Sequence, residues 1–384
     1  MVTAEPAVVD NTDLPGVTAE DAGPPAKTPK RQHDLDALRG FFLVWMTLTH
    51  LPTHVSYYTN QPVGFVSAAE GFIFLSAFLS GRIFGRKWYE KGPWTITARL
   101  LKRAARLYSY HLFLLAIAFT VVASIAVHTK QPSLEGLIDF YLAHPVLGLV
   151  SSVLLIYRPP LLDILPMYII FLASTPSILF VGRRWGWNWV LVPSFSIWLA
   201  AQFGLRNLVY NVTGSLTGFH IPLGAMGAFD LYAWQFLWVA GVCMGCGGAQ
   251  RLERLARSKA FILLLTLAAV GFVFIRHSYL WNNLNAAPWI PFTDKWRLAS
   301  LRLVNFAILG MLFAAWKDRL ARWIAIPPLV VMGKASLEVF CAHLLICFEA
   351  LALVGDGTGL AVGPQAAIVI SALLALYIVG RAFA

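Results

Sequence analysis

The chain has 384 residues, of which 58% are hydrophobic and 13% are charged, and its mean hydropathy is +0.66. Soluble domains carry about 25% charged residues, so this composition excludes a soluble globular protein and predicts an all-α polytopic membrane protein. The net charge of +11 does not indicate nucleic-acid binding, because the basic residues lie in short segments between apolar stretches, where they set orientation in the membrane. We therefore expect a lipid bilayer around the protein and no nucleic acid as a partner.

The first residues differ in composition from the rest of the chain. Residues 1–33 are rich in Pro, Ala, Thr, Asp and Glu and contain no apolar run, which predicts a disordered cytoplasmic tail. They lack the short basic start and apolar centre of a signal peptide. Continuous hydropathy then favours a single membrane domain over residues 34–384.

Ten apolar segments predict about ten transmembrane helices. They cover approximately residues 37–58, 64–85, 107–128, 161–181, 187–204, 229–249, 259–277, 298–316, 325–350 and 365–381. With the N-terminus in the cytoplasm, this arrangement places 21 of the 30 Lys and Arg residues on the cytoplasmic side and 6 outside. Because cytoplasmic segments are enriched in Lys and Arg, we predict that both termini are cytoplasmic. Residues 133–160 hold an apolar run too short to span, which predicts a re-entrant or interfacial piece on the outer side.

The first apolar segment carries three polar residues on one face. Arg39 and His50 are three helical turns apart, roughly 16 Å along the axis, and Asp36 precedes Arg39 by one turn. Such groups are costly in lipid, so they must face a protein interior or a wet cavity. Imidazole titrates near neutral pH, and His50 is therefore a candidate general base for a sugar hydroxyl. The alternative is a histidine held at the membrane interface, since Pro52 follows closely.

The second apolar segment begins with Ser67-Ala-Ala-Glu70, the pattern of a capping box. Capping is one role for Glu70. The other is catalytic: Glu70 enters from the outer end of its helix, at the depth of His50, and a carboxylate there can orient the imidazole. Ser76 and Ser80 follow on one face, and Ser76 is a supporting candidate.

A basic stretch follows the second segment. Arg99, Arg103 and Arg106 share a helical face. Anchoring on the cytoplasmic side is one explanation. The sharper one is a site for a polyanion such as the phosphates of coenzyme A, because the planar guanidinium binds phosphate in a bidentate manner.

The ninth apolar segment contains further ionisable residues. Ser336 and His343 lie seven residues apart on one face, and Glu338 can pair with Lys334 four residues earlier. Arg302 of the eighth segment is a weaker candidate, which could place a cation near the catalytic centre. No pattern of metal ligands is present, and we expect no metal; the C-x-x-C spacing of Cys243 and Cys246 lies in an apolar segment without further ligands.

Together these stretches resemble the OpgC family, within the acyltransferase-3 superfamily of membrane acyltransferases. The resemblance rests on Leu35–Gly40 followed by His50, Ser67–Ser76, Arg103–Arg106, Ile164–Tyr168, Phe229–Gln235 and Lys334–His343. It implies that Arg39 and His50 form the Arg-x10-His pair needed for acyl transfer, and that Arg103 and Arg106 form a cytoplasmic motif linked to acyl-CoA. It also implies succinylation of osmoregulated periplasmic glucans in a Gram-negative bacterium.

The expected function is thus a transmembrane O-acyltransferase of the bacterial inner membrane, with succinyl-CoA as cytoplasmic co-substrate and no permanently bound cofactor. The acceptor is a glucan or another polysaccharide on the periplasmic side. There Tyr210, Phe219, Trp281 and Trp289 can stack on sugar rings; the alternative is that they anchor the protein at the membrane interface. Two alternatives remain open: acylation, such as acetylation, of a different envelope polysaccharide, and a transporter of a small anion. No residue pattern predicts an oligomeric state.

Overall fold

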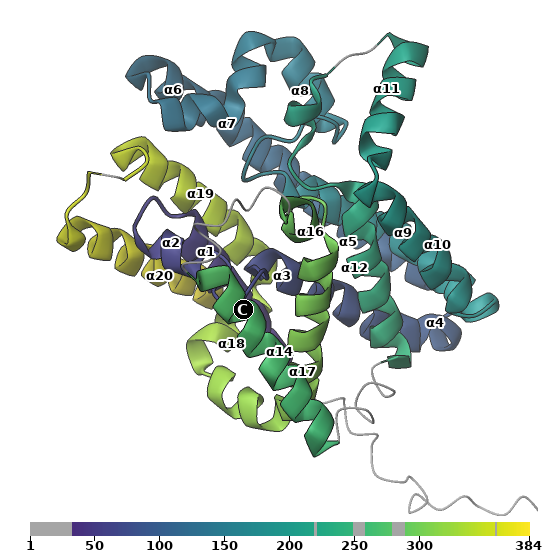
Figure 1. Cartoon of the computed structure of the whole chain (residues 1–384). Helices are drawn as coiled ribbons and strands as arrows, with labels where there is room; N and C mark the ends of the chain where they lie inside the picture. Colours follow the sequence, from purple (N-terminus) through teal and green to yellow (C-terminus); the bar gives the residue numbers. More distant parts are fainter. Residues whose placement is uncertain (1–32, 219–220, 249–257, 279–288, 358) are drawn as a thin grey trace, which may run out of the picture. The chain divides into compact units, whose positions relative to one another are not determined.

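The computed structural model describes residues 33–218, 221–248, 258–278, 289–357 and 359–384, and every regular element among them is helical (Figure 1). The helices are α1 (His33–His50), α2 (Val55–Thr59), α3 (Ala68–Ser80), α4 (Arg86–Lys91), α5 (Pro93–Ile117), α6 (Ala123–Thr129), α7 (Pro132–Ala143), α8 (Pro145–Val153), α9 (Ile164–Arg184), α10 (Asn188–Gln202), α11 (Leu205–Thr217), α12 (Leu231–Cys243), α14 (Lys259–His277), α16 (Ile290–Thr293), α17 (Ser300–Ile324), α18 (Pro327–Lys334), α19 (Ser336–Val354) and α20 (Val362–Phe383). The predicted tail, apart from His33, lies outside the described residues.

Seven helices of the described residues are long and apolar enough to cross a membrane. They are Ala68–Lys91, Pro93–Thr129, Ile164–Arg184, Lys259–His277, Ser300–Lys317, Ser336–Val354 and Val362–Phe383. The bent pair α7 and α8 can supply an eighth span. An all-α, multi-pass membrane protein is therefore confirmed, whereas the count of about ten and the cytoplasmic termini stay predictions. Other predicted spans are shorter or more charged than these helices. For example, α10 and α12 have only 15 and 13 residues, and α1 carries the charged residues Asp34, Asp36 and Arg39.

The segment predicted to be re-entrant or interfacial forms α7 and α8, which are bent by 95° at His144. The bend follows from Pro145, since a proline disfavours helical backbone at the residue before it, and His144 has φ −136°. Tyr141 of α7 stacks on Phe119 with ring centroids 3.9 Å apart. This contact fixes the bent pair against the π-helical turn Ala118–Val122 that joins α5 to α6.

The limits of several predicted helices differ in the structure, for example Pro93–Thr129 where 107–128 was expected, and two of the differences bear on the site. The first was expected over 37–58 but α1 ends at His50, because Pro52 prevents helical backbone at the residue before it. The ninth was expected as one helix over 325–350. It is two, α18 and α19, with a break at Ala335, and the break places both Lys334 and Ser336 on the wall of one cavity.

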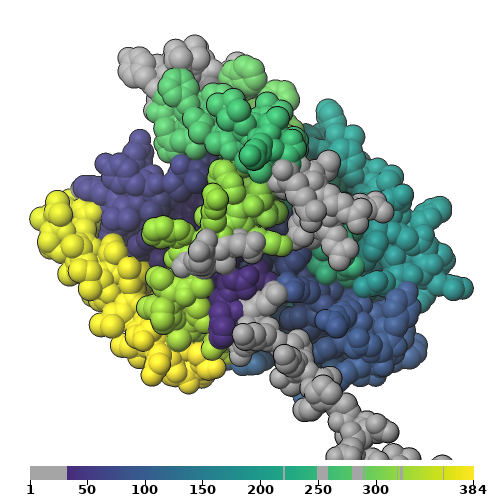
Figure 2. All heavy atoms as spheres, turned by 90° about the horizontal axis from the view of Figure 1, so that it is seen from below, coloured from purple at the N-terminus to yellow at the C-terminus, as the bar shows by residue number. Residues whose placement is uncertain are grey.

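Glycines allow α1 to pack closely against α18. A Cβ atom at Gly40 would overlap the carbonyl oxygen of Leu329, and one at Gly333 would overlap that of Asp36. Small residues at helix contacts are typical of membrane proteins, where close backbone approach supplies the packing energy. In Figure 2 the purple start of α1 lies beside the yellow-green segment that contains α18. This contact sets the position of Arg39, which directly precedes Gly40.

The core of the helical domain surrounds α3 and α9. Phe72 of α3 stacks on Phe340 of α19 with centroids 5.8 Å apart, and Tyr168 of α9 packs on Trp238 of α12 at 5.3 Å. In contrast, α14 and α20 keep large apolar side chains exposed, including Leu264, Leu267, Ile370 and Leu374. An apolar exterior of this kind is suited to lipid.

Candidate active site

One cavity, of about 190 Å³, lies between α1, α3, α5, α9, α18 and α19, and we call it the arginine cavity. It combines four cations, one carboxylate and an apolar wall, and is lined by Arg39, Phe72, Arg103, Arg106, Leu107, Ile164, Leu165, Tyr168, Lys334, Ser336, Leu337, Glu338 and Phe340. The excess of positive charge suits a multiply charged anion such as a phosphate ester.

Arg39 contributes a buried donor to this cavity. Its Nε atom has no hydrogen-bond partner among the described residues. Tyr168 lies between two guanidinium groups: its hydroxyl accepts a hydrogen bond from Arg103 Nη2 at 3.4 Å, and it interacts electrostatically with Arg39, as does Asp36. Because buried polar groups in proteins are almost always satisfied, the unused Nε donor indicates a place for an acceptor atom of a ligand.

The three arginines predicted to bind acyl-CoA are separated by the structure. Arg103 and Arg106 line the arginine cavity, whereas Arg99 is exposed and lies away from it. Arg106 is ion-paired to Glu338 at 2.7 Å, and Tyr110 donates to the same carboxylate oxygen at 3.2 Å. The expected pairing of Glu338 with Lys334 is therefore wrong. Because the helix breaks at Ala335, Lys334 and Glu338 do not lie on one face of a continuous helix. Lys334 lines the cavity instead.

A second cavity, of about 60 Å³, lies next to the end of α1, and we call it the histidine cavity. It is lined by Met46, Thr49, His50, Ser67, Ala68, Ala69, Leu161, Ile164, Phe229, Lys295, Trp296, Phe340 and His343.

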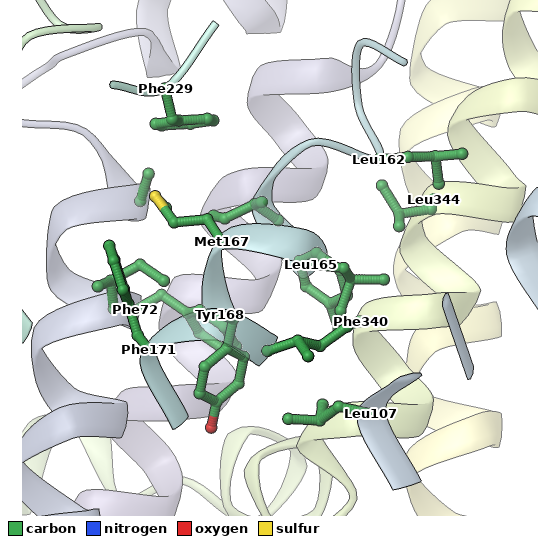
Figure 3. Packing of buried hydrophobic residues seen from close by; sticks show 14 of the residues in the cluster. Phe72, Leu107, Leu162, Leu165, Met167, Tyr168, Phe171, Phe229, Phe340 and Leu344 are labelled. Carbon is green, nitrogen blue, oxygen red and sulfur yellow. The ribbon is translucent and has the colours of Figure 1, made fainter. Parts of the chain in front are cut away.

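The two cavities share Ile164 and Phe340 as wall residues. In Figure 3, Phe72, Leu165 and Phe340 lie between Phe229, of the histidine cavity, and the hydroxyl of Tyr168, of the arginine cavity. The cavities are therefore neighbours, and apolar side chains lie between them; we call this apolar boundary the constriction.

His50 and His343 form a hydrogen-bonded pair. Nδ1 of His50 lies 3.1 Å from Nε2 of His343, and Nδ1 of His343 lies 3.0 Å from the carbonyl oxygen of Phe340. A carbonyl oxygen only accepts, so Nδ1 of His343 carries its proton, and Nε2 of the neutral ring must accept. The neutral His50 then donates through Nδ1. Its Nε2 keeps a lone pair, as a general base requires.

Glu70 does not hold the imidazole of His50, contrary to the expected orienting contact. It is fully buried and forms a short ion pair with Arg302 through Oε1. Its Oε2 accepts from the backbone N–H of Ser67 at 3.0 Å and from the Ser67 hydroxyl at 2.5 Å. The predicted capping box is thus confirmed. The residue in the orienting position at His50 is instead His343.

The other supporting candidates have distinct places. Ser336 lines the arginine cavity, whereas Ser76 is buried in α3 and lines neither cavity. Arg302 is neutralised by Glu70, so it is not the spare cation that we expected near the catalytic centre. Of the aromatic residues predicted to stack on sugars, Trp281 and Phe219 lie outside the described residues, and Trp289 and Tyr210 line neither cavity.

Lys295, which belongs to none of the predicted sites, lies on the wall of the histidine cavity in the segment between α16 and α17. Burial lowers the pKa of its ammonium, while the negative charges of Glu70 and Asp163 act in the opposite sense. Asp163, at the start of α9, accepts from the backbone N–H of Ala228 at 3.2 Å, and burial raises its pKa to about 6. The one signal in the sequence was a lysine directly before Trp296, among aromatic residues of a predicted outer segment.

The arrangement can therefore hold an anionic donor molecule on one side of a constriction and a base on the other. A protein family model described as OpgC protein matches residues 31–384. No curated protein and no solved structure matched the chain. The matched region includes both cavities and all described helices, and the chain belongs to the OpgC protein family, which indicates a membrane acyltransferase.

Proposed function

We propose that the protein is a transmembrane O-acyltransferase of the bacterial inner membrane, which transfers succinyl from cytoplasmic succinyl-CoA to hydroxyl groups of osmoregulated periplasmic glucans. The observation that carries the proposal is the pair of adjoining cavities, one cationic and one containing His50, with Ile164 and Phe340 in both walls. In this proposal the start of α1 is cytoplasmic, as the distribution of Lys and Arg favours.

The donor binds in the arginine cavity. Arg103, Arg106 and Lys334 face the phosphates of coenzyme A, and the pantetheine arm passes Arg39 and Tyr168 toward the constriction. The narrow, apolar wall around Phe72 and Phe340 fits an uncharged thioester arm and disfavours hydrated ions. That wall supports acyl transfer over the transport of a small anion.

The acceptor hydroxyl reaches the histidine cavity from the periplasm. Nε2 of His50 removes its proton while the hydroxyl oxygen attacks the thioester carbonyl. The tetrahedral intermediate then collapses: the C–S bond breaks, the new ester C–O bond remains, and the proton passes from the His50 imidazolium to the departing thiolate. His343 accepts the Nδ1–H of His50, keeps the ring in this tautomer, and stabilises the imidazolium as it forms.

Comparison of glucans from cells with and without this gene tests the proposal. The extracted glucans are separated by anion exchange and weighed by mass spectrometry. We expect loss of negative charge and of succinyl mass in the deleted strain, restored by the wild-type gene. Unchanged glucans would refute the acceptor assignment, and a lost acyl group of another mass would replace succinyl with that group.

Arg103 offers a test of the donor side. Arg103→Gln is expected to raise KM for acyl-CoA roughly tenfold and to change kcat less, because a charge-assisted contact to phosphate contributes about 1.5–3 kcal/mol. The matched control is Lys102→Gln, at the neighbouring exposed position of α5 outside the cavity. Equal KM values for the two variants would place the phosphates elsewhere.

His343 can be tested as a positioning residue. Glutamine can still accept a hydrogen bond from His50 Nδ1, whereas alanine cannot. We therefore expect His343→Gln to keep at least roughly tenfold more kcat than His343→Ala, since a lost buried hydrogen bond costs about 1–3 kcal/mol. The pH dependence of kcat should shift in the alanine variant. If both variants have the same kcat and an unshifted dependence of kcat on pH, His343 contributes only packing.

A further inference from the structure

Lys295 places an ammonium group on the wall of the histidine cavity, and no carboxylate of the described residues lies at ion-pair distance from it. Its contacts in the described part of the chain are with two aromatic rings: Nζ lies 4.9 Å from the centroid of Trp296 and 6.0 Å from that of Phe229. Glu70 and Asp163 act on it at longer range, but Glu70 is already neutralised by Arg302. A half-buried cation that faces an apolar cavity wall is costly unless an anion joins it.

The backbone around Lys295 is fixed by hydrogen bonds. The carbonyl oxygen of Trp296 accepts from the backbone N–H of Asp230 at 3.0 Å and from the indole of Trp234 at 3.1 Å. The carbonyl oxygen of Lys295 accepts from Leu298 at 3.2 Å. Lys295 therefore lies in a segment whose backbone is held by hydrogen bonds. Its position beside the cavity is set by α12 and the start of α17.

Three other cations of the described residues already have partners. Arg302 pairs with Glu70, Arg297 pairs with Asp294 at 2.9 Å, and Arg158 donates to the carbonyl oxygen of Leu155 at 3.0 Å. None of these three lines the histidine cavity. Within the described residues, Lys295 is thus the cation that a group bound beside His50 would meet.

We propose that Lys295 binds the free carboxylate of a dicarboxylic acyl group and so selects succinyl over uncharged acyl donors. This assignment rests on the proposed acyltransferase function, and it makes Lys295 a residue that determines specificity for the acyl donor. With C–C bonds of about 1.5 Å, two methylenes put this carboxylate carbon roughly 4 Å beyond the thioester carbonyl. A water needs about 10–15 Å³, so the cavity of about 60 Å³ accepts a short acyl chain. An uncharged acyl group would leave the ammonium unpaired, which is the basis for its rejection.

The test compares two donors of equal carbon number, succinyl-CoA and butyryl-CoA. The full-length protein, purified in detergent, is assayed with each donor and with glucan from cells that lack the gene. Lys295→Met is expected to lower kcat/KM for succinyl-CoA at least roughly tenfold and to leave that for butyryl-CoA unchanged or higher. Lys295→Arg keeps most of the succinyl preference. Arg297 is a nearby cation outside the cavity. Arg297→Met is therefore expected to keep the wild-type ratio of kcat/KM for succinyl-CoA to kcat/KM for butyryl-CoA.

Three outcomes would overturn the assignment. If Lys295→Met lowers kcat/KM equally for both donors, Lys295 has a structural or general electrostatic role. If the wild-type protein prefers butyryl-CoA, a carboxylate site is excluded. If wild-type protein transfers neither acyl group, the proposed function itself is refuted and this proposal with it. Should Lys295→Met not fold, Lys295→Gln carries the same expectation, and its elution on size exclusion shows whether it is folded.

Discussion

Replacement of His50 by alanine is expected to lower acyl transfer by roughly 10²–10⁴-fold, the usual contribution of a general base, with normal insertion of the protein in the membrane. His50 is half-buried at the end of α1, so its removal opens little space in the core. The expected loss is in kcat, because the coenzyme A part of the donor binds in the other cavity. The measurement is the rate of succinyl transfer by purified protein at saturating succinyl-CoA, normalised to folded protein.

His54 provides the matched control for this experiment. It lies four residues further along the chain and is exposed. Gln365 accepts from its backbone N–H at 2.7 Å and donates to its Nδ1 at 3.2 Å. His54→Ala should therefore keep kcat close to that of the wild type. A His50→Ala variant with wild-type activity would remove His50 from the mechanism. Equal losses in both variants would point to a structural effect of either substitution on this end of α1.

Separation of the Glu70–Arg302 pair is expected to be the most destabilising change in the membrane domain. Both side chains are fully buried, and loss of one partner leaves an uncompensated charge, at a cost of about 3–5 kcal/mol. Glu70→Gln and Arg302→Met should each lower the free energy of unfolding by this amount. The double variant, which leaves neither charge, should recover a large part of the loss. Unfolding with SDS in mixed micelles gives the free energies.

The surface pair Asp294–Arg297 is the control for the buried one. Arg297 is partly exposed, and exposed ion pairs contribute about 0–1 kcal/mol, so Arg297→Met should change stability within that range. If Glu70→Gln is as stable as the wild type but inactive, Glu70 has the catalytic role that is one of the two predicted from the sequence. If the decrease in the free energy of unfolding in the double variant equals the sum of the decreases in the two single variants, the two side chains do not stabilise each other.

The sequence by itself determined the class of the protein and most of its helices. The membrane class follows from composition, and helices lie within all ten predicted apolar segments. The capping box of Ser67 and Glu70 was also readable, because its partners are only three residues apart. The separation of Arg39 and His50 by three turns of one helix was readable as well, because local geometry fixes that distance.

Only the tertiary structure decided which side chains meet. His50 bonds to a residue 293 positions away, and Glu70 pairs with one 232 positions away. The periodicity of a helix tells which residues share a face, but not which helix that face meets or at what rotation. Close packing of α1 on α18 through Gly40 and Gly333, and the break of the ninth segment at Ala335, set those rotations. They gave His50 its partner, whereas Lys295 reaches the same cavity from the segment between α16 and α17.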